Sequence, residues 1–198
     1  MDVKAHRLIS LPFGLLGMLW VAPAMAQAPA SPPAQAVSPE LIAKVNKLVD
    51  ADSARLTEVF KDFHQHPEIA FTEVRTSGIV AKELRSQGFE VTERIGKTGV
   101  VGVLKNGAGP TVWFRADMDS NSVNETTGLP YAAKSKQRLE DGSEIDVMHA
   151  CGHDAHVTWM LGMARAMAAL KSDWAGTLVV YAQPAEEVGL GAQAMVND

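Results

Sequence analysis

The sequence contains very little cysteine and no excess of positive charge. A single cysteine, Cys151, stands among 198 residues, so the chain can form no internal disulfide. Lysine and arginine total 18 against 23 aspartate and glutamate residues, which gives a formal net charge of −5 at pH 7. This balance excludes the basic footprint of a nucleic-acid-binding domain. The lone cysteine is therefore either a buried, inert residue or one with a chemical task.

Long hydrophobic runs are also lacking, except near the N-terminus. Two basic residues precede an apolar stretch, 8–21, and a small-residue cleavage site ends at Ala26. This order is typical of a secretory signal peptide. We expect residues 1–26 to be removed and the protein to be exported, to the periplasm or as a secreted protein. A stable membrane anchor is the alternative, but the stretch is short and no basic residues follow it.

For the rest of the chain, the sequence predicts a flexible leader and one folded segment without internal repeats. Residues 27–37 are rich in Ala, Pro and Gln and have no apolar periodicity. The apolar spacing predicts helices at 38–66, 72–87 and 156–170, with a short one after Gly191. Strands are predicted at 90–95, 100–104, 111–116 and 177–182, and a long polar loop at 120–143. We expect three tryptophans to lie in the core: Trp113, Trp159 and Trp174. This alternation predicts an α/β domain over 38–198, with a largely parallel or mixed sheet covered by helices.

Candidate metal ligands begin just before the predicted helix at 156–170. Cys151 and His153 flank Gly152, which lets the backbone bend so that both side chains converge on one ion. We expect a metal ion and the positive end of the helix to lower the pKa of the Cys151 thiol.

A pair of glutamates follows the predicted strand at 177–182. Glu187 is expected to bind metal, while Glu186 takes a proton from water and passes it to a leaving amine. A thiolate, an imidazole and a carboxylate suit zinc best, and manganese, cobalt and nickel remain open. The strand at 111–116 also ends in acidic residues, so all these groups are expected at one edge of the sheet.

Four segments together resemble a known family. They are His64 to Glu68, Arg115 to Asp119, Met148 to Asp154 and Pro184 to Glu187. Their order and spacing are similar to those of the metal-dependent N-acyl-amino-acid amidohydrolases, which include hippurate hydrolase-like and indole-acetyl-amino-acid hydrolase-like enzymes within the wider aminoacylase and carboxypeptidase family. The resemblance implies a zinc-exopeptidase-like catalytic domain, with a mixed sheet flanked by helices and a small-molecule N-acyl amino acid or peptide substrate.

Carried over by position, the resemblance implies two divalent metal ions. It makes Cys151, His153 and Glu187 metal ligands, Glu186 the catalytic base and Asp117 a supporting residue. Two further histidine ligands and a lid and dimerisation domain are expected beyond Asp198, with a homo-oligomeric full-length form. We therefore expect this chain alone to be inactive.

Two alternatives remain open at this point. The chain could be a truncated or non-catalytic metal-binding fragment. It could also be a thiol hydrolase that uses Cys151 as nucleophile, although a nucleophile and its base usually come from separate segments. The remaining histidines receive no firm role: His149 and His156 are expected to be either outer partners of the site or structural, and His64 and His66 only to close a helix.

Overall fold

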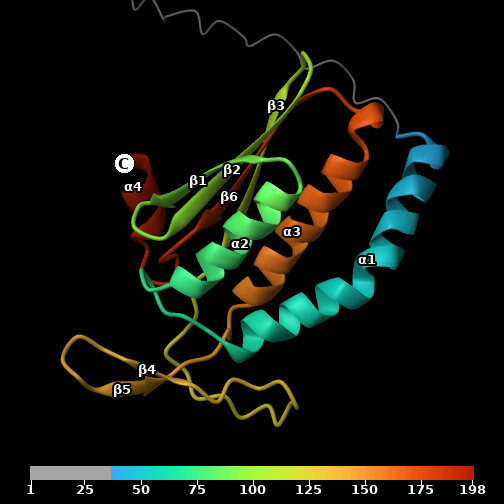
Figure 1. Cartoon of the computed structure of the whole chain (residues 1–198). Coiled ribbons are helices and arrows are strands. Elements are labelled where there is room, and N and C mark those ends of the chain that lie inside the picture. Colours follow the sequence, from blue (N-terminus) through green and yellow to red (C-terminus); the bar gives the residue numbers. More distant parts are fainter. Residues whose placement is uncertain (1–36) are drawn as a thin grey trace, which may run out of the picture. The chain divides into compact units, whose positions relative to one another are not determined.

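A computed structural model of the protein describes residues 37–198, and the fold there is a mixed sheet covered by helices on one face (Figure 1). The predicted signal peptide, and all of the predicted leader except Val37, lie outside the described residues. The elements in chain order are α1 (Pro39–Gln65), α2 (Val74–Ser86), β1 (Glu90–Ile95), β2 (Gly99–Asn106), β3 (Thr111–Asp117), β4 (Lys136–Arg138), β5 (Glu144–Asp146), α3 (His153–Ala169), the 3₁₀ turn η1 (Lys171–Asp173), β6 (Gly176–Gln183) and α4 (Gly191–Val196).

Local signals set the ends of helix α1. The Ser38 side chain accepts a hydrogen bond from the backbone N–H of Leu41 at 3.2 Å, and Pro39 occupies the first turn. At the other end, the backbone N–H of His66 donates to Phe63, and Pro67 follows. The prediction of a helix from Ser38 to His66 is therefore confirmed to within one residue at each end.

The main sheet has the strand order β1-β2-β6-β3. Strands β1 and β2 pair antiparallel, as do β2 and β6, whereas β3 and β6 pair in parallel with Asp117 opposite Gln183. The mixed α/β prediction is confirmed, and the single parallel pair is the one whose connection passes through helix α3. The carboxyl ends of β3 and β6 therefore meet at one edge of the sheet.

The core lies between the sheet and helices α2 and α3, with α1 packed against α3 (Figure 1). Side chains from alternate positions of the strands meet the apolar faces of the helices. The buried cluster includes Phe63, Val80, Leu84, Val100, Leu104, Val157, Met160, Leu161, Leu178 and Val180. None of the helices within residues 37–198 has the length and hydropathy that a membrane span requires.

Three features differ from the expectations. The predicted polar loop contains strand β4, which forms a hairpin with β5, because strands of three mostly polar residues carry no hydrophobic alternation. Trp113 and Trp159, predicted in the core, are 65% and 66% exposed, since each sits on the side of its element that points away from the cluster. Trp174 alone follows the prediction and packs against the core.

Candidate metal centre

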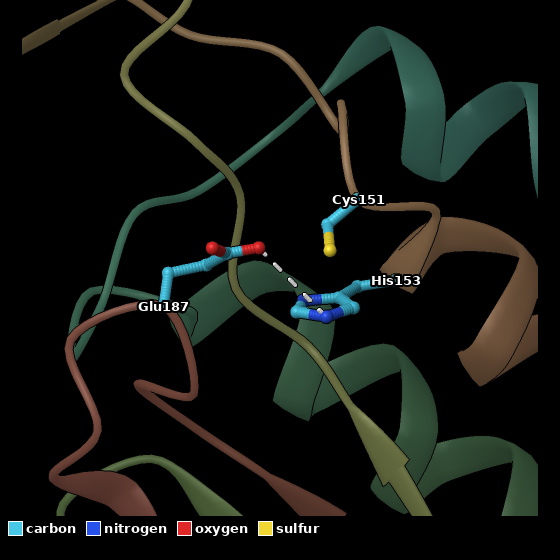
Figure 2. Close-up of side chains that lie close together, drawn as sticks. All are labelled: Cys151, His153 and Glu187. Carbon is cyan, nitrogen blue, oxygen red and sulfur yellow. Dashed lines mark ion pairs between the residues drawn. The ribbon is translucent and has the colours of Figure 1, made fainter.

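Cys151, His153 and Glu187 gather at the shared edge of β3 and β6. Cys151 and His153 stand at the start of α3, and Glu187 follows β6 (Figure 2). One possible ligand atom from each of the three side chains lies within 4.8 Å of the others. The structure thus brings together the three ligands that the sequence predicts.

Gly152 makes this convergence possible. It is the N-cap of α3 and has φ +80°, in the left-handed region that L-residues with a Cβ rarely adopt. A Cβ added to Gly152 would meet nothing within 4 Å, so the requirement is one of backbone conformation and not of space. The left-handed residue turns the chain between Cys151 and His153 so that both side chains face the same side.

The imidazole of His153 is buried, and a hydrogen bond to the backbone of Asp119 orients it. Its Nδ1 lies 2.8 Å from the backbone carbonyl oxygen of Asp119, and its Nε2 lies 3.9 Å from Glu187 Oε1. Burial alone lowers the pKa of His153, but hydrogen bonds and the charge of Asp119 outweigh it and raise the pKa to about 9. Nε2 is therefore the nitrogen available to a metal ion.

Asp119 contacts the predicted ligands, although no role of its own was predicted for it from the sequence. Its side chain is fully buried, and its Oδ2 accepts a hydrogen bond from the backbone N–H of Glu187 at 2.9 Å. Burial raises the pKa of Asp119, but hydrogen bonds from His153 and from the Glu187 backbone reverse this and lower it. Asp119 thus contacts two of the three predicted ligands, His153 through its backbone carbonyl oxygen and the Glu187 backbone through its carboxylate. The available signal was its place two residues after Asp117, beyond the strand end.

The side chain of Asp117 contacts Arg115 and His156 and not the three predicted ligands. It forms two hydrogen bonds with Arg115, each 2.9 Å, and its Oδ2 lies 3.3 Å from Nδ1 of His156. Its negative charge contributes to raising the pKa of both His153 and Cys151. Its predicted supporting role stays a prediction, since the structure gives it only this electrostatic influence on the ligands.

Cys151 is exposed, which rules out the inert core residue. The pKa of its thiol is raised, first by a hydrogen bond to Glu187 and then by the negative charges of Glu187 and Glu186. The expected lowering required the helix end together with a metal ion, and the neighbouring carboxylates act in the opposite direction. A cation between these groups is therefore needed to hold Cys151 as a thiolate.

Glu186 points toward the same imidazole from a more open position. Its Oε2 lies 3.7 Å from Nε2 of His153, and its side chain remains 39% exposed. It is not one of the three grouped ligands among the described residues. The division between Glu187 as ligand and Glu186 as base stays a prediction, since both carboxylates lie at a similar distance from Nε2 of His153.

Two other histidines, His64 and His149, are buried in surroundings that the sequence did not reveal. His64, given no role, is buried, with Nδ1 2.6 Å from Asp154 and Nε2 3.1 Å from Glu125. His149 is buried, neither ring nitrogen has a hydrogen-bond partner within residues 37–198, and burial lowers its pKa to about 4. The partners of His64 are 61 and 90 residues away in the sequence, so no local sequence pattern could predict these contacts.

Comparisons with known proteins find a matching family and similar relatives. Residues 113–198 match the model of peptidase family M20/M25/M40. Hippurate hydrolase from Campylobacter jejuni is 46% identical over 136 residues, 68% of this chain and 33% of that protein. N-acetyl-L-cysteine deacetylase from Bacillus subtilis is 34% identical over 145 residues, 73% of this chain and 33% of that protein.

A solved structure extends the likeness to the fold. The Bacillus subtilis YXEP protein, described as a dinuclear metal binding peptidase from the M20 family, is 33% identical. It matches with a TM-score of 0.66 over 75% of this chain and 39% of that one. The chain spans about a third of the length of the curated relatives it matches. Through residues 113–198, the chain belongs to peptidase family M20/M25/M40.

Proposed function

We propose that this chain supplies metal ligands and the catalytic base of an enzyme that hydrolyses the amide bond of N-acyl amino acids or small peptides. The observation that carries the proposal is the gathering of Cys151, His153 and Glu187 beside the free carboxylate of Glu186. The substrate class is supported by relatives named as a hippurate hydrolase and an N-acetyl-L-cysteine deacetylase.

The donor set fits a divalent metal ion. Zinc prefers such a set of a thiolate, an imidazole and a carboxylate, and manganese, cobalt and nickel are alternatives. Nδ1 of the imidazole is already bonded to the backbone oxygen of Asp119, which leaves Nε2 for the ion. When bound, such an ion polarises a substrate carbonyl and acidifies water. We propose two ions, in line with the dinuclear description of YXEP, and three protein ligands are too few for both. The remaining ligands would come from another part of the full-length protein.

The chain's own chemistry is proton transfer by Glu186. Its carboxylate is exposed enough to meet a substrate and close enough to the ligands to accept a proton from the attacking water. The same oxygen then delivers the proton to the amide nitrogen as the amino acid leaves. Glu187, fixed through its backbone by Asp119, keeps its carboxylate on the ligand side.

The test uses the full-length protein loaded with Zn²⁺ or Mn²⁺ and follows release of free amino acid from acylated substrates. Glu186→Gln should lower kcat by about 10²–10⁴-fold while the metal content stays unchanged. Glu58→Gln, at an exposed position on α1, is the matched control and should leave kcat unaltered. Unchanged turnover in Glu186→Gln would remove Glu186 from the mechanism.

Inhibition experiments separate this function from the alternatives. Loss of activity with a chelator, reversed by added metal, supports hydrolysis by activated water. Inactivation by thiol alkylation that bound metal does not prevent would favour Cys151 as a nucleophile. Stable metal binding without turnover in the full-length protein would favour a non-catalytic metal-binding protein.

We also propose that the protein is exported. The support is the order of basic residues, the apolar stretch 8–21 and the small residues up to Ala26. N-terminal sequencing of the mature protein should begin at Gln27. A mature protein that retains Met1 in the cytoplasm would contradict the export.

A further inference from the structure

A buried glutamate far from the metal ligands in sequence contacts the turn that carries Glu186 and Glu187. The side chain of Glu73 is inaccessible to solvent. Its Oε1 accepts hydrogen bonds from the backbone N–H groups of Phe71 at 3.0 Å and Ala185 at 2.8 Å, and its Oε2 accepts one from the Thr98 hydroxyl at 2.5 Å. Ala185 lies 112 residues further along the chain. A carboxylate is rarely buried unless such bonds compensate for the lost water.

The position of Glu73 makes this contact unexpected. Glu73 is the N-cap of α2, yet its side chain makes no capping hydrogen bond to that helix. The first turn of α2 is capped instead by Glu68, which accepts the backbone N–H groups of Arg75 at 2.9 Å and Thr76 at 2.8 Å. Because Glu68 satisfies the start of the helix, the Glu73 carboxylate is free to turn toward Ala185.

Ala185 is the residue whose conformation directs the turn. It has φ +50°, in the left-handed region that a non-glycine residue occupies at a cost, and it is fully buried. Its carbonyl oxygen accepts the backbone N–H groups of Leu190 at 3.3 Å and Gly191 at 3.1 Å. The polar groups on both sides of Ala185 are therefore engaged, and Glu73 is the partner on the N–H side.

Two buried carboxylates hold the turn at neighbouring points. Glu73 accepts the N–H of Ala185, and Asp119 accepts the N–H of Glu187. Glu186 lies between these two fixed amides. A buried backbone N–H without an acceptor is costly, so the bond to Glu73 favours the conformation of Ala185 that makes it.

We propose that Glu73 is a positioning residue, which holds Ala185 in the left-handed conformation and so sets the directions of the Glu186 and Glu187 side chains. Without this bond, Ala185 relaxes toward an ordinary conformation, and a rotation there swings both following carboxylates. The consequence for catalysis rests on the proposed hydrolysis, whereas the consequence for metal binding rests only on the proposed ligands.

The experiment compares Glu73→Ala, Glu73→Gln and Glu68→Ala in the full-length protein. Glu68→Ala is the matched control because it also removes a glutamate that accepts backbone N–H groups near the start of α2, but it does not touch the turn. Zn²⁺ affinity is measured by competition with a chelator at a temperature where all variants are folded. Hydrogen exchange of the Ala185 amide is followed in parallel.

Glu73→Ala should weaken Zn²⁺ binding by about tenfold or more and abolish protection of the Ala185 amide. Glu73→Gln should restore most of both, since its carbonyl oxygen can still accept the N–H groups of Phe71 and Ala185 and Thr98 can reorient its hydroxyl. Glu68→Ala should keep Zn²⁺ affinity and Ala185 protection near those of the unmodified protein, whatever its thermal stability. Equal losses in Glu73→Ala and Glu68→Ala, or no loss in Glu73→Ala, would overturn the proposal.

Two provisions keep the result interpretable. If Glu73→Ala does not fold, Glu73→Met takes its place, because methionine fills a similar volume without an oxygen to accept the Ala185 N–H. Unprotected Ala185 and weakened metal binding in Glu73→Met support the proposal, and unchanged values reject it. If the unmodified protein binds Zn²⁺ but hydrolyses no acylated amino acid, the proposed function fails while the role of Glu73 is still measured.

Discussion

The Nδ1 atom of His153 lies 2.8 Å from the backbone carbonyl oxygen of Asp119, and the side chain of the same aspartate accepts the backbone N–H of Glu187. One residue just after β3 therefore orients the imidazole of His153 and fixes the backbone of Glu187. Groups that hydrogen-bond to metal-binding side chains determine how well those side chains are preorganised for a metal ion.

Replacing Asp119 should weaken metal binding without removing any ligand. We expect Asp119→Asn to lower Zn²⁺ affinity by about tenfold, and Asp119→Ala by up to about 100-fold, because the alanine also leaves the Glu187 N–H without its acceptor. Asp117→Asn serves as the comparison, since Asp117 contacts Arg115 and His156. A larger loss in Asp117→Asn than in Asp119→Asn, measured by competition titration, would reverse the assignment of the two aspartates.

Metal binding should release protons at neutral pH. The pKa of His153 is raised to about 9 and the pKa of the Cys151 thiol is also raised, so both ligands carry a proton before the ion arrives. Both must lose it to coordinate, and affinity should therefore increase with pH up to about 9. Calorimetric titrations with Zn²⁺ in buffers of different ionisation enthalpy check this. An observed enthalpy that is independent of the buffer would contradict it.

The contact of His64 with Glu125 and Asp154 should make stability depend on pH in a defined window. Burial alone lowers the pKa of His64, but hydrogen bonds with Asp154 and Glu125 outweigh it and raise the pKa. Burial raises the pKa of Glu125, but hydrogen bonds with Thr127 and Ala133 and the contact with His64 lower it. The raised histidine stabilises fully below its unfolded pKa of about 6.5, and the lowered glutamate fully above its unfolded pKa of about 4.3.

The difference in unfolding free energy between the unmodified protein and His64→Asn should thus be largest between about pH 4.3 and 6.5. It should shrink as the pH rises through the raised pKa of His64, and again as the pH falls through the lowered pKa of Glu125. Urea unfolding of the metal-free full-length protein at several pH values gives this difference curve. A flat curve would mean that the contact carries no charge.

Two glycines should respond to alanine in opposite ways. A Cβ on Gly191 would lie 1.5 Å from the carbonyl oxygen of Pro184, which is backbone next to the catalytic turn, so Gly191→Ala should destabilise the protein by about 1–3 kcal/mol. A Cβ on Gly78, within α2, would meet nothing within 4 Å. Gly78→Ala should therefore stabilise the protein by about 0.5–1 kcal/mol. Thermal or urea unfolding measures both, and equal effects would show that crowding at Pro184 is relieved without cost.

Local chemistry explains which parts of the fold the sequence could predict. Helix α1 was predictable because its cap, Ser38, and its terminating Pro67 are local signals. The hairpin of β4 and β5 was missed because its strands are short and mostly polar. Trp113 was misplaced because alternation gives two faces to a strand without saying which face the helices cover.

The same distinction holds for the candidate site. The sequence could predict that Cys151, His153, Glu186 and Glu187 lie together, because their residue types and spacing are typical of a metal site. Asp119, Glu73 and His64 were not, because each acts through a partner that only folding brings near. Their contacts span 68, 112 and 90 residues.

The parallel pairing of β3 with β6 has a consequence for the order of events during folding. Asp119 follows β3, whereas Glu187 follows β6, and they come together only after the chain has crossed over through α3 and the two strands have paired. This pairing is among the long-range contacts of the fold, and closing such loops is slow. The metal centre therefore does not exist in a chain that has formed only its helices and the β1–β2 hairpin. A metal ion can therefore bind at this centre only after β3 and β6 have paired, and it stabilises only molecules that have reached this stage.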